Sequence, residues 1–594
     1  MNLILCWALA LVFSSLRFTG AFLFAKAKLP RTSPQVLSNT NNRVTNLPDT
    51  SVASRIDEAI PFLQQVGRSY PDNKDAWEQD IDKLHDLLHL SRYNHSAIRK
   101  HVFNLPINDR TTNDDGSYQG QEDDLSLENY KYEYPFGPTY ARPIAVGQSI
   151  DLKQLLDVSV TSEWICSLQV LVTLFLLSSC VPLSLFIHRV IGGKDTLDLL
   201  LRLGLVYLSD EEWVVPIIHL FPLQIPQLPG TRHQLTAAKD IVLMTDLHPS
   251  VLSVTTIPSG EAEEGAVMYI GPDSIALVQH LHASFLEYVN NRNLGRAKFR
   301  ILDVCCGSGV QALAALGMFD LLRGHAATAN IEAEAVAIDV NQRALRFTEF
   351  NALLNGVKVK TMKIDLLTDN AATSIEELDA TEECKGFDIL LANPPFIPTP
   401  NLVSDDAALS LREVASNNSF QSYGLFSSGG VSGEDCLCAI IQMAPLVLRS
   451  DGGLLGIVSE FMNPPLIELE EQKCELLTKM EQWWGADHEV SASGVLFTNE
   501  QPLTCQVYAQ RRALTDDNSV ISLWLNHLES NNIEHVSPGL LFVTYGSKGS
   551  YSDKKGCNIE SSLVPKTSQG SAWTPHNFHA VEYTMKVLRD LYQF

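Results

Sequence analysis

The first residues that suggest chemistry are Asn393–Phe396, which end the apolar run "FDILLANPPFIP" at 387–398. Proline has no backbone N–H, so two prolines in succession cannot continue a strand inside a sheet. The run therefore predicts a buried strand that stops at Asn393 and carries a side-chain amide at its carboxyl end. In an open α/β sheet, ligands bind outside that end of the strands. A simple strand-ending turn is the alternative interpretation.

A glycine-rich turn precedes this run in the sequence. "RILDVCCGSGVQALAAL" predicts a strand, a turn and a helix. Gly307 and Gly309 let the backbone pass close to a ligand, and the helix start supplies unpaired N–H groups. The pattern is not the dinucleotide GxGxxG, because position 312 is alanine. Cys305 occupies a position that is often glycine in related loops.

Acidic residues end the next two expected strands. Asp339 ends "AIDVN", where a carboxylate can accept hydrogen bonds from ribose hydroxyls. Helix capping is the alternative role for this aspartate. Asp365 of "KIDLL" is placed to reach an adenine amine. The Gly loop, the two acids and Asn393 follow one another in the order expected for four parallel strands whose carboxyl ends share one edge.

These motifs resemble a known enzyme family. "LDVCCGSG", "IDVNQRAL", "NPPF" and the later "YGLFSSGGVSGEDCL" look like a class I S-adenosylmethionine (SAM)-dependent methyltransferase of the small-domain type, related to the HemK/PrmC release-factor glutamine methyltransferases. The resemblance covers about 265–545, and more loosely 150–260. "NPPFIP" is similar to the "NPPYIP" of the glutamine enzymes, and "NPPF" also resembles the ribosomal-RNA guanine-N2 methyltransferases.

The resemblance implies SAM as cofactor and a set of site residues. The implied cofactor-binding residues are Asp303, Gly307, Gly309, Asp339, Asn341, Asp365 and Leu366. The implied catalytic residues are Asn393, Pro394, Pro395 and Phe396. In the family, the Asn side-chain oxygen and the first proline carbonyl accept N–H bonds from a planar, poorly nucleophilic nitrogen. The second proline fixes the backbone, and the aromatic ring packs on the flat face of the substrate.

Two substrates fit such a site, and a third function also stays open. The acceptor is either a protein glutamine, as in release factors, or the exocyclic amine of an RNA base, guanine N2 or adenine N6. The formal net charge of -25 and the "IP" after "NPPF" slightly favour a protein over RNA. The cysteine at 305 leaves room for a non-catalytic binding module that kept the fold.

The expected fold class is α/β, with a Rossmann-like, mostly parallel sheet and antiparallel edge strands from "EVSASGVLF", "CQVYAQ" and "GLLFVTY". "YIGPDSIALVQHL" looks like the segment that closes over the cofactor, with Pro272 and Asp273 as contacts or Asp273 as a helix cap. The predicted divisions are a presequence at 1–48, a helical segment at 49–103, a linker at 104–146, a winged-helix-like domain at 147–262, the methyltransferase domain at 263–545, and a tail with a terminal helix at 546–594.

The apolar stretch 164–187 has 24 residues without charge and must be weighed as a membrane span. "SSCVP" interrupts it, so a pair of buried helices is favoured. With the following helix and two short strands, this order is winged-helix-like. The 11 cysteines show no zinc spacing, and no metal is expected.

The N-terminus is typical of a targeting sequence. "LILCWALALVF" is about as long as a signal-peptide core, and the stretch to Pro48 has basic and hydroxyl residues but no acid. A signal core followed by a transit-like segment resembles the bipartite presequences of complex plastids. An ordinary secretory signal and a cytoplasmic location are the alternatives.

Overall fold

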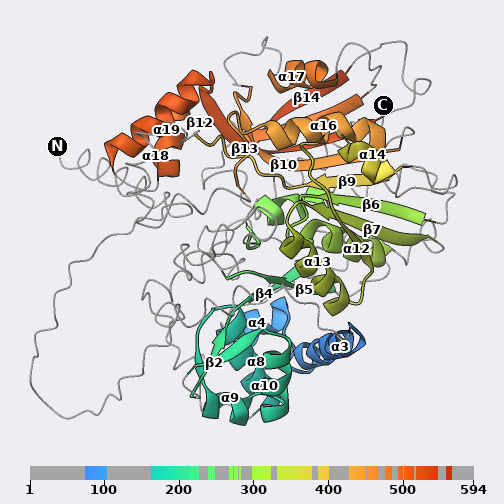
Figure 1. Cartoon of the computed structure of the whole chain (residues 1–594), viewed down its shortest axis with the longest axis vertical. Coiled ribbons are helices and arrows are strands. Elements are labelled where there is room, and N and C mark those ends of the chain that lie inside the picture. Colours follow the sequence, from blue (N-terminus) through green and yellow to red (C-terminus); the bar gives the residue numbers. More distant parts are fainter. Residues whose placement is uncertain are drawn as a thin grey trace, which may run out of the picture.

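The computed structural model shown in Figure 1 describes a set of ranges within the chain. They are 74–102, 162–209, 212–225, 239–247, 267–271, 273–278, 280–281, 298–322, 331–368, 370–376, 386–400, 427–449, 453–465, 475–484, 492–499, 501–513, 517–545 and, as backbone, 557–564. The predicted presequence, the linker at 104–146 and the terminal helix lie outside these ranges.

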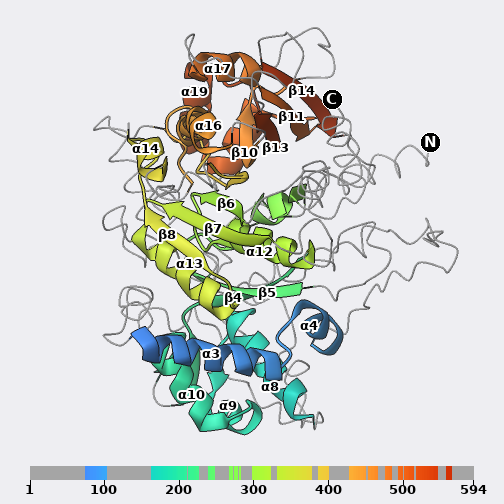
Figure 2. The ribbon, with the colours of Figure 1, turned by 90° about the vertical axis from the view of Figure 1, so that its right-hand side faces the viewer.

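A nine-stranded sheet forms the larger part of the molecule (Figures 1 and 2). Its order is β14-β11-β13-β10-β9-β6-β7-β8, and β12 pairs with β13. The strands are β6 (Lys298–Val304), β7 (Glu332–Asp339), β8 (Val359–Lys363), β9 (Ile389–Ala392), β10 (Leu454–Met462), β11 (Ala492–Asn499), β12 (Leu503–Thr504), β13 (His535–Tyr545) and β14 (Cys557–Val564). The expected α/β class with a mostly parallel sheet is confirmed.

The antiparallel strand lies elsewhere than the sequence predicts. β13 pairs antiparallel with β10 and β11, so it lies inside the sheet rather than at its edge. β14 pairs parallel with β11 and forms the edge itself. The region after 545, expected to be a polar tail, therefore contributes a strand to the sheet. Its polar sequence gives little sign of this, because an edge strand needs to bury only part of its surface.

Helices cover both faces of the sheet. In β6, Phe299 and Ile301 join one apolar cluster, whereas Leu302 and Val304 join another, as the two-residue period of a strand requires. α12 (Val310–Leu322) and α13 (Gln342–Leu354) pack on the first face. α14 (Ala371–Glu376), α16 (Asp435–Val447) and α17 (Glu475–Trp484) pack on the second. α12 is apolar nearly all round because the sheet lies on one side of it and the N-terminal elements lie on the other.

The N-terminal elements have the predicted order of helix, helix, helix and hairpin. They are α8 (Glu163–Phe175), β1 (Val181–Pro182), α9 (Leu183–Arg189), α10 (Gly193–Arg202), β2 (Val206–Ser209) and β3 (Trp213–Pro216), and the strands pair as β1-β3-β2. The apolar stretch 164–187 is thus split between two short helices. Within the described ranges, no helix has the length and apolar character needed to cross a membrane.

A hairpin attaches this N-terminal unit to the sheet domain. β4 (His219–Ile225) pairs with β5 (Lys239–Thr245), and both contact α12. Asn351 and Asn355, one turn apart on α13, each exchange two hydrogen bonds with the backbone of β5, at Met244 and Val242, over 2.6–3.0 Å. Each side-chain amide thus replaces the backbone of a neighbouring strand, and the hairpin edge is satisfied.

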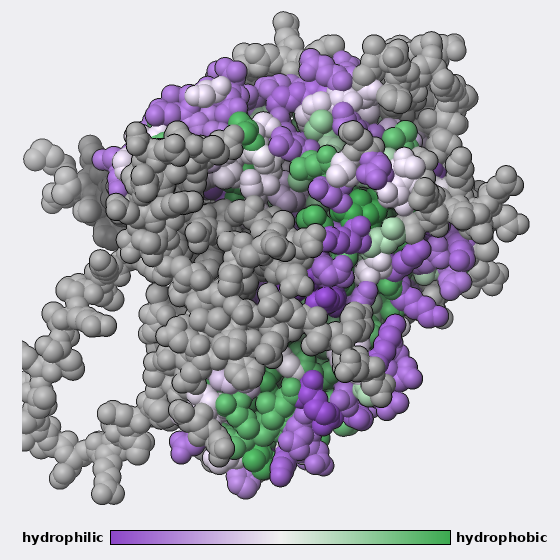
Figure 3. All heavy atoms as spheres, in the orientation of Figure 1, coloured by the Kyte–Doolittle hydropathy of each residue, from purple (hydrophilic) through white to green (hydrophobic). Residues whose placement is uncertain are grey.

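α3 (Lys74–Leu90) and α4 (His95–His101) complete the unit, and α3 contacts α13. α3 covers most of "AWEQDIDKLHDLLHLSRY", for which the sequence predicts a helix, whereas "RIDEAIPFLQQV" lies outside the described residues. Apolar side chains gather over the N-terminal elements at the lower end of the face drawn in Figure 3, and the upper end is mostly polar.

"CQVYAQ" is not a strand, contrary to the sequence prediction. It begins α18 (Cys505–Ala513), which packs on α19 (Asn518–Ser530). Tyr508, Ala509 and Ala513 are buried at helical spacing against Trp524 of α19. The tertiary contact with α19 therefore outweighs the β propensity of the short stretch. The two helices form an insertion between β11 and β13, beside the carboxyl end of β10 (Figure 1).

Candidate active site

Four strands end at the same edge of the sheet, as the sequence predicts. Val304 of β6 is opposite Ile338 of β7 on one side and Ala392 of β9 on the other. Asp339 at the end of β7 is opposite Lys363 of β8. The Gly loop, Asp339, Asp365 and Asn393 therefore leave the sheet side by side. This edge is where an open α/β sheet binds ligands.

The Gly loop depends on left-handed backbone conformations. Gly307 has φ +54°, Gly309 has φ +77°, and Cys305 has φ +57°. A Cβ atom on Gly309 would lie 2.7 Å from Thr348 Cγ2, whereas one on Gly307 would meet nothing within 4 Å. Gly309 is thus required by packing, and Gly307 faces open space. Cys305 adopts the glycine-like conformation at a cost of about 1–2 kcal/mol, so the sequence departure at 305 does not alter the loop.

Asp303 lies beneath this loop and is fully buried. Its Oδ2 accepts a hydrogen bond of 2.9 Å from the backbone N–H of Ala312 on α12. Its Oδ1 has no partner among the described residues. Burial raises the pKa of Asp303 well above its ordinary value. A buried, unpartnered carboxylate oxygen beside a Gly loop suits a cationic ligand group, such as an ammonium.

Asp339 connects the Gly loop to the start of α13. Its two oxygens accept backbone N–H bonds of 2.9 Å, from Gly307 and from Asn341. Burial raises its pKa, although these two bonds act in the opposite direction. Each oxygen keeps one lone pair for a further donor, such as a ribose hydroxyl. The N-cap of α13 is Asn341, whose Oδ1 accepts from Arg343 N over 3.0 Å.

The residues after β8 lie next along this edge. The backbone N–H of Ile364 donates to the carbonyl of Asp339 over 3.1 Å, which brings the third strand end to the second. Asp365 is exposed, and its Oδ1 accepts from Leu367 N over 3.0 Å. Leu366 is half-buried and packs on the apolar cluster of this face of the sheet. The roles of Asp365 and Leu366 in cofactor binding stay predictions.

Asn393 is held by its side-chain nitrogen. Nδ2 donates to Asp273 Oδ2 over 3.1 Å and to Ser274 Oγ over 3.0 Å. Asp273 and Ser274 begin the helical residues 273–278 of the segment expected to close over the cofactor, and Asp273 contacts Asn393 there. Pro272 lies outside the described residues. Within the described residues nothing donates to Asn393 Oδ1 or to the carbonyl of the buried Pro394.

A second glycine loop, residues 427–434, wraps around the residues that follow. Ile397 pairs with Ser428, and a Cβ on Gly429 or Gly433 would lie 2.7–2.8 Å from the backbone of Phe396. The Phe396 ring is half-buried and packs against the α18–α19 insertion. The sequence motif "SSGGVSGED" is therefore the support of Asn-Pro-Pro-Phe, although it is about thirty residues away in the chain.

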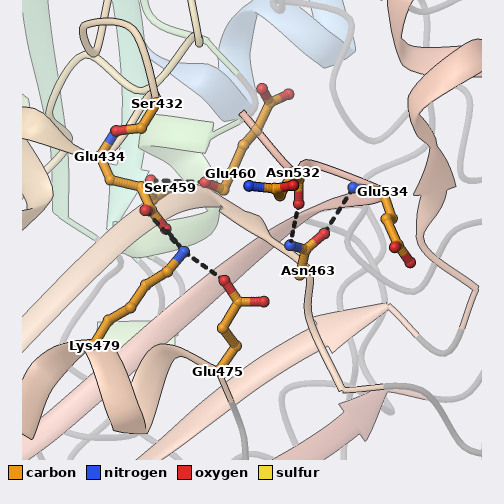
Figure 4. Close-up of polar contacts among 9 residues, drawn as sticks. All are labelled: Ser432, Glu434, Ser459, Glu460, Asn463, Glu475, Lys479, Asn532 and Glu534. Carbon is orange, nitrogen blue, oxygen red and sulfur yellow. Dashed lines mark hydrogen bonds and ion pairs between the residues drawn. The ribbon is translucent and has the colours of Figure 1, made fainter. Parts of the chain in front are cut away.

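Polar contacts brace this wall of the site (Figure 4). Lys479 of α17 reaches Glu434 over 2.9 Å and Glu475 over 2.9 Å, which ties the end of the second glycine loop to α17. Asn463, after β10, donates to the Asn532 carbonyl over 2.8 Å and accepts from Glu534 N over 2.8 Å. The Asn463 contacts hold the end of β10 to the residues before β13, and Met462 and Val536 of these strands share an apolar cluster with Ile397.

The Glu460 carboxylate lies beside the site at the end of β10. It accepts bonds of 2.6 Å from the Tyr508 hydroxyl and from Arg512 Nη2, both on α18. The negative charge of Glu460 also raises the pKa of Asp273, in addition to the larger effect of burial. Sequence reasoning missed Glu460 and the contacts that Asp273 and Ser274 make with Asn393. They are separated from their partners by roughly 50 to 120 residues, and no local pattern encodes such pairings.

The residues at this edge fit SAM. Asp303 presents an unpartnered buried oxygen, Gly307 faces open space, and Asp339 has lone pairs to spare. In the described ranges, no group of three or more His, Cys, Asp or Glu side chains could hold a metal ion.

Part of the chain is similar in sequence to known methyltransferases. The chain is 28% identical over 149 residues to a release factor glutamine methyltransferase of Deinococcus radiodurans and 32% identical over 160 residues to that of Prochlorococcus marinus. These matches cover 25% and 26% of this chain, and 45% and 44% of the relatives. The chain thus spans less than half the length of the curated relatives it matches. No family model matches the chain.

Among solved structures, the chain is similar to a class I SAM-dependent methyltransferase of Listeria monocytogenes, at 11% identity with a TM-score of 0.28, covering 90% of this chain and 99% of that one. It is also similar to a 16S rRNA N2 methyltransferase of T. thermophilus in complex with AdoMet and guanosine, at 16% identity with a TM-score of 0.22, covering 50% and 61%.

The sheet order, the Gly loop and the carboxylates beneath and beside it define a class I SAM-dependent methyltransferase fold. The chain is therefore a Rossmann-like protein with the binding edge of this class. Within the class it is related to the release factor glutamine methyltransferases, to which part of its sequence is 28–32% identical.

Proposed function

We propose that this protein is a SAM-dependent N-methyltransferase that methylates the side-chain amide nitrogen of a glutamine in a protein, of the release-factor type. One observation carries the proposal. Asn393 uses its nitrogen to contact Asp273 and Ser274, so its oxygen and the Pro394 carbonyl are two acceptors without donors among the described residues. A primary amide has two N–H donors to give to such a pair.

Two acceptors at this position address the difficulty of the reaction. An amide nitrogen is a poor nucleophile because its lone pair is delocalised into the carbonyl group. Accepting both N–H bonds increases the electron density on nitrogen and fixes its direction. Pro395 limits the backbone, so the Pro394 carbonyl is preorganised. Most of the rate then comes from alignment and electrostatics rather than from a strong base.

Bound SAM supplies a methyl group on a positively charged sulfur. The chain's own residues hold the two partners in place. Asp303 and Asp339 would hold the cofactor at the ends of β6 and β7. Asn393 follows β9, which pairs with β6, so it lies one strand away from Cys305 of the Gly loop. The methyl carbon would pass from sulfur to the substrate nitrogen, the electron pair of the broken carbon–sulfur bond would stay on sulfur, and the nitrogen would release one proton to water. Phe396 offers the exposed part of its ring to the flat face of the amide.

Charge around the acceptor site favours a protein over RNA. Asp273 contacts Asn393 directly. Glu460 is near enough to raise the pKa of Asp273. Phosphate groups bound close to these carboxylates would be repelled. Arg512 is paired with Glu460, and the two side chains are only 13% and 15% exposed. This cation is therefore already paired with a carboxylate. The names of the curated relatives support a release factor as the substrate.

The test uses the full chain with SAM labelled on the methyl group. It is incubated separately with the protein fraction and with the ribosomal and transfer RNA of the same cells. We expect label in the protein fraction, located by mass spectrometry on the amide nitrogen of one glutamine. Label in RNA alone would replace the glutamine with a base as the acceptor. Label in neither fraction, with SAM bound, would contradict methyl transfer.

A further inference from the structure

The orientation of the Asn393 amide is a structural problem in its own right. The oxygen and nitrogen ends of a carboxamide are nearly equal in size, and its terminal torsion has a broad two-fold preference. An amide with its nitrogen toward the acceptor would present donors to the donors of the substrate. Only one of the two orientations can therefore accept the substrate N–H.

We propose that Asp273 and Ser274 are positioning residues that hold Asn393 with its oxygen toward the acceptor nitrogen. This inference rests on the proposed function. The Asp273 carboxylate accepts hydrogen bonds and cannot donate one while it is ionised. Its Oδ2 takes one N–H of Asn393 over 3.1 Å, and Ser274 Oγ takes the other over 3.0 Å. With both N–H groups used, the oxygen faces away from this pair.

The geometry around Asp273 is built for this contact. A Cβ atom on Gly271 would lie 2.2 Å from Asp273 Oδ1, so only glycine at 271 leaves room for this side-chain conformation. Ser274 is 5% exposed, and its carbonyl accepts from Gln311 Nε2 over 3.2 Å. Gln311, itself 1% exposed, belongs to the first turn of α12. The helix that follows the Gly loop thus also holds the residues that orient Asn393.

Val267, which precedes Gly271 and Asp273 in the chain, is also held by hydrogen bonding. The backbone N–H of Val267 donates to Asp246 Oδ2 over 2.7 Å. Asp246 in turn forms a two-pronged, buried ion pair with Arg343 at the start of α13. Val267 and Ser274 are therefore tied to α13 and α12, the two helices that follow the cofactor-binding strands. The same two helices thus support both the Gly loop and the residues that orient Asn393. Catalysis by alignment requires such a fixed relation between cofactor and acceptor.

Two substitutions at residue 273 distinguish the role of its acceptor oxygen from the role of its negative charge. Asp273→Ala removes the acceptor, whereas Asp273→Asn can still present an oxygen to Asn393. We expect Asp273→Ala to lower kcat about 10- to 100-fold without a change in the Kd of SAM measured by calorimetry. Asp273→Asn should recover most of that loss, and Ser274→Ala should lower kcat by a smaller factor. Asp80→Ala, which removes a carboxylate paired with Arg202 on the remote helix α3, is the control and should leave kcat unchanged.

A double-mutant cycle distinguishes positioning from simple structural support. In an Asn393→Ala background, Asp273→Ala should have no further effect on the residual rate, because the group it orients is gone. Equal losses in both backgrounds, or a parallel loss of SAM affinity, would overturn the inference. So would full activity of Asp273→Ala. If that variant does not fold, the same cycle with Ser274→Ala decides. An inactive wild-type protein would instead overturn the proposed function, and the inference with it.

Discussion

Two similar substitutions in the Gly loop should differ in effect: Gly309→Ala should mainly lower stability, and Gly307→Ala should mainly weaken SAM binding. Gly307→Ala and Gly309→Ala both place an alanine at positive φ, which costs about 1–2 kcal/mol in each case. The Cβ on residue 309 would also collide with Thr348 at 2.7 Å, and overpacking adds about 1–3 kcal/mol. The Cβ on residue 307 meets no atom of the described residues within 4 Å. Gly309→Ala should therefore lower the free energy of unfolding by about 2–5 kcal/mol, and Gly307→Ala by only about 1–2 kcal/mol.

For SAM binding we expect the larger direct effect from Gly307→Ala, the variant that costs less stability. If SAM occupies the open space beside Gly307, the added methyl group displaces it. Gly307→Ala should then weaken SAM binding at least tenfold while the protein remains folded. Urea denaturation measures the stability of each variant, and titration calorimetry at a temperature where both are folded measures the Kd of SAM. Wild-type affinity in Gly307→Ala would show that the cofactor lies elsewhere and would refute this assignment of the loop.

The remaining predictions concern stability and targeting. Arg343→Ala leaves Asp246 buried without its cation and should lower the free energy of unfolding by about 3–5 kcal/mol in urea denaturation; a loss below about 1 kcal/mol would contradict the burial of the pair. Burial raises the pKa of Asp240 from 3.8 to about 7, so its contribution to stability is full below pH 4 and is lost as the pH rises through about 7. The free energy of unfolding of the wild-type chain should therefore fall between about pH 4 and pH 7, and Asp240→Asn should remove up to about 4 kcal/mol of this fall. The same pH profile of stability in both proteins would contradict the raised pKa of Asp240. We also propose that residues 1–48 direct the protein to a complex plastid; a fluorescent fusion of this segment should accumulate there, and secretion or a cytoplasmic signal would support the alternatives.

The parts of the site that could be predicted from sequence are those fixed by local pattern. A parallel strand must end at its neighbours' edge, so the order of the motifs along the chain is enough to place the ends of β6, β7 and β9 together. Two prolines stop β9, and the glycines of the first loop indicate a close backbone turn. Cys305 is the position at which the sequence departs from the usual loop, and its backbone adopts the conformation that glycine would adopt.

The parts that escaped prediction depend on distant contacts. Asp273 precedes Asn393 by 120 residues, and their hydrogen bond exists only once the sheet has formed. "CQVYAQ" is helical because Tyr508 and Ala509 find a partner surface on α19. β14 is a strand because β11 offers an edge to which it can pair. In each case a tertiary partner decides a structure that local propensity leaves open.

Asn393 is the centre of acceptor binding in the proposed mechanism, and one measurement tests this role most directly. Methyl transfer to the protein fraction is compared between the wild-type chain, Asn393→Ala and a remote control, Asn94→Ala, which removes the cap of α4. SAM binding is measured on the same preparations. We predict a loss of about 10²–10³ in kcat for Asn393→Ala, with the Kd of SAM unchanged and the control near wild type. Equal transfer by Asn393→Ala and wild type would contradict the role of this residue.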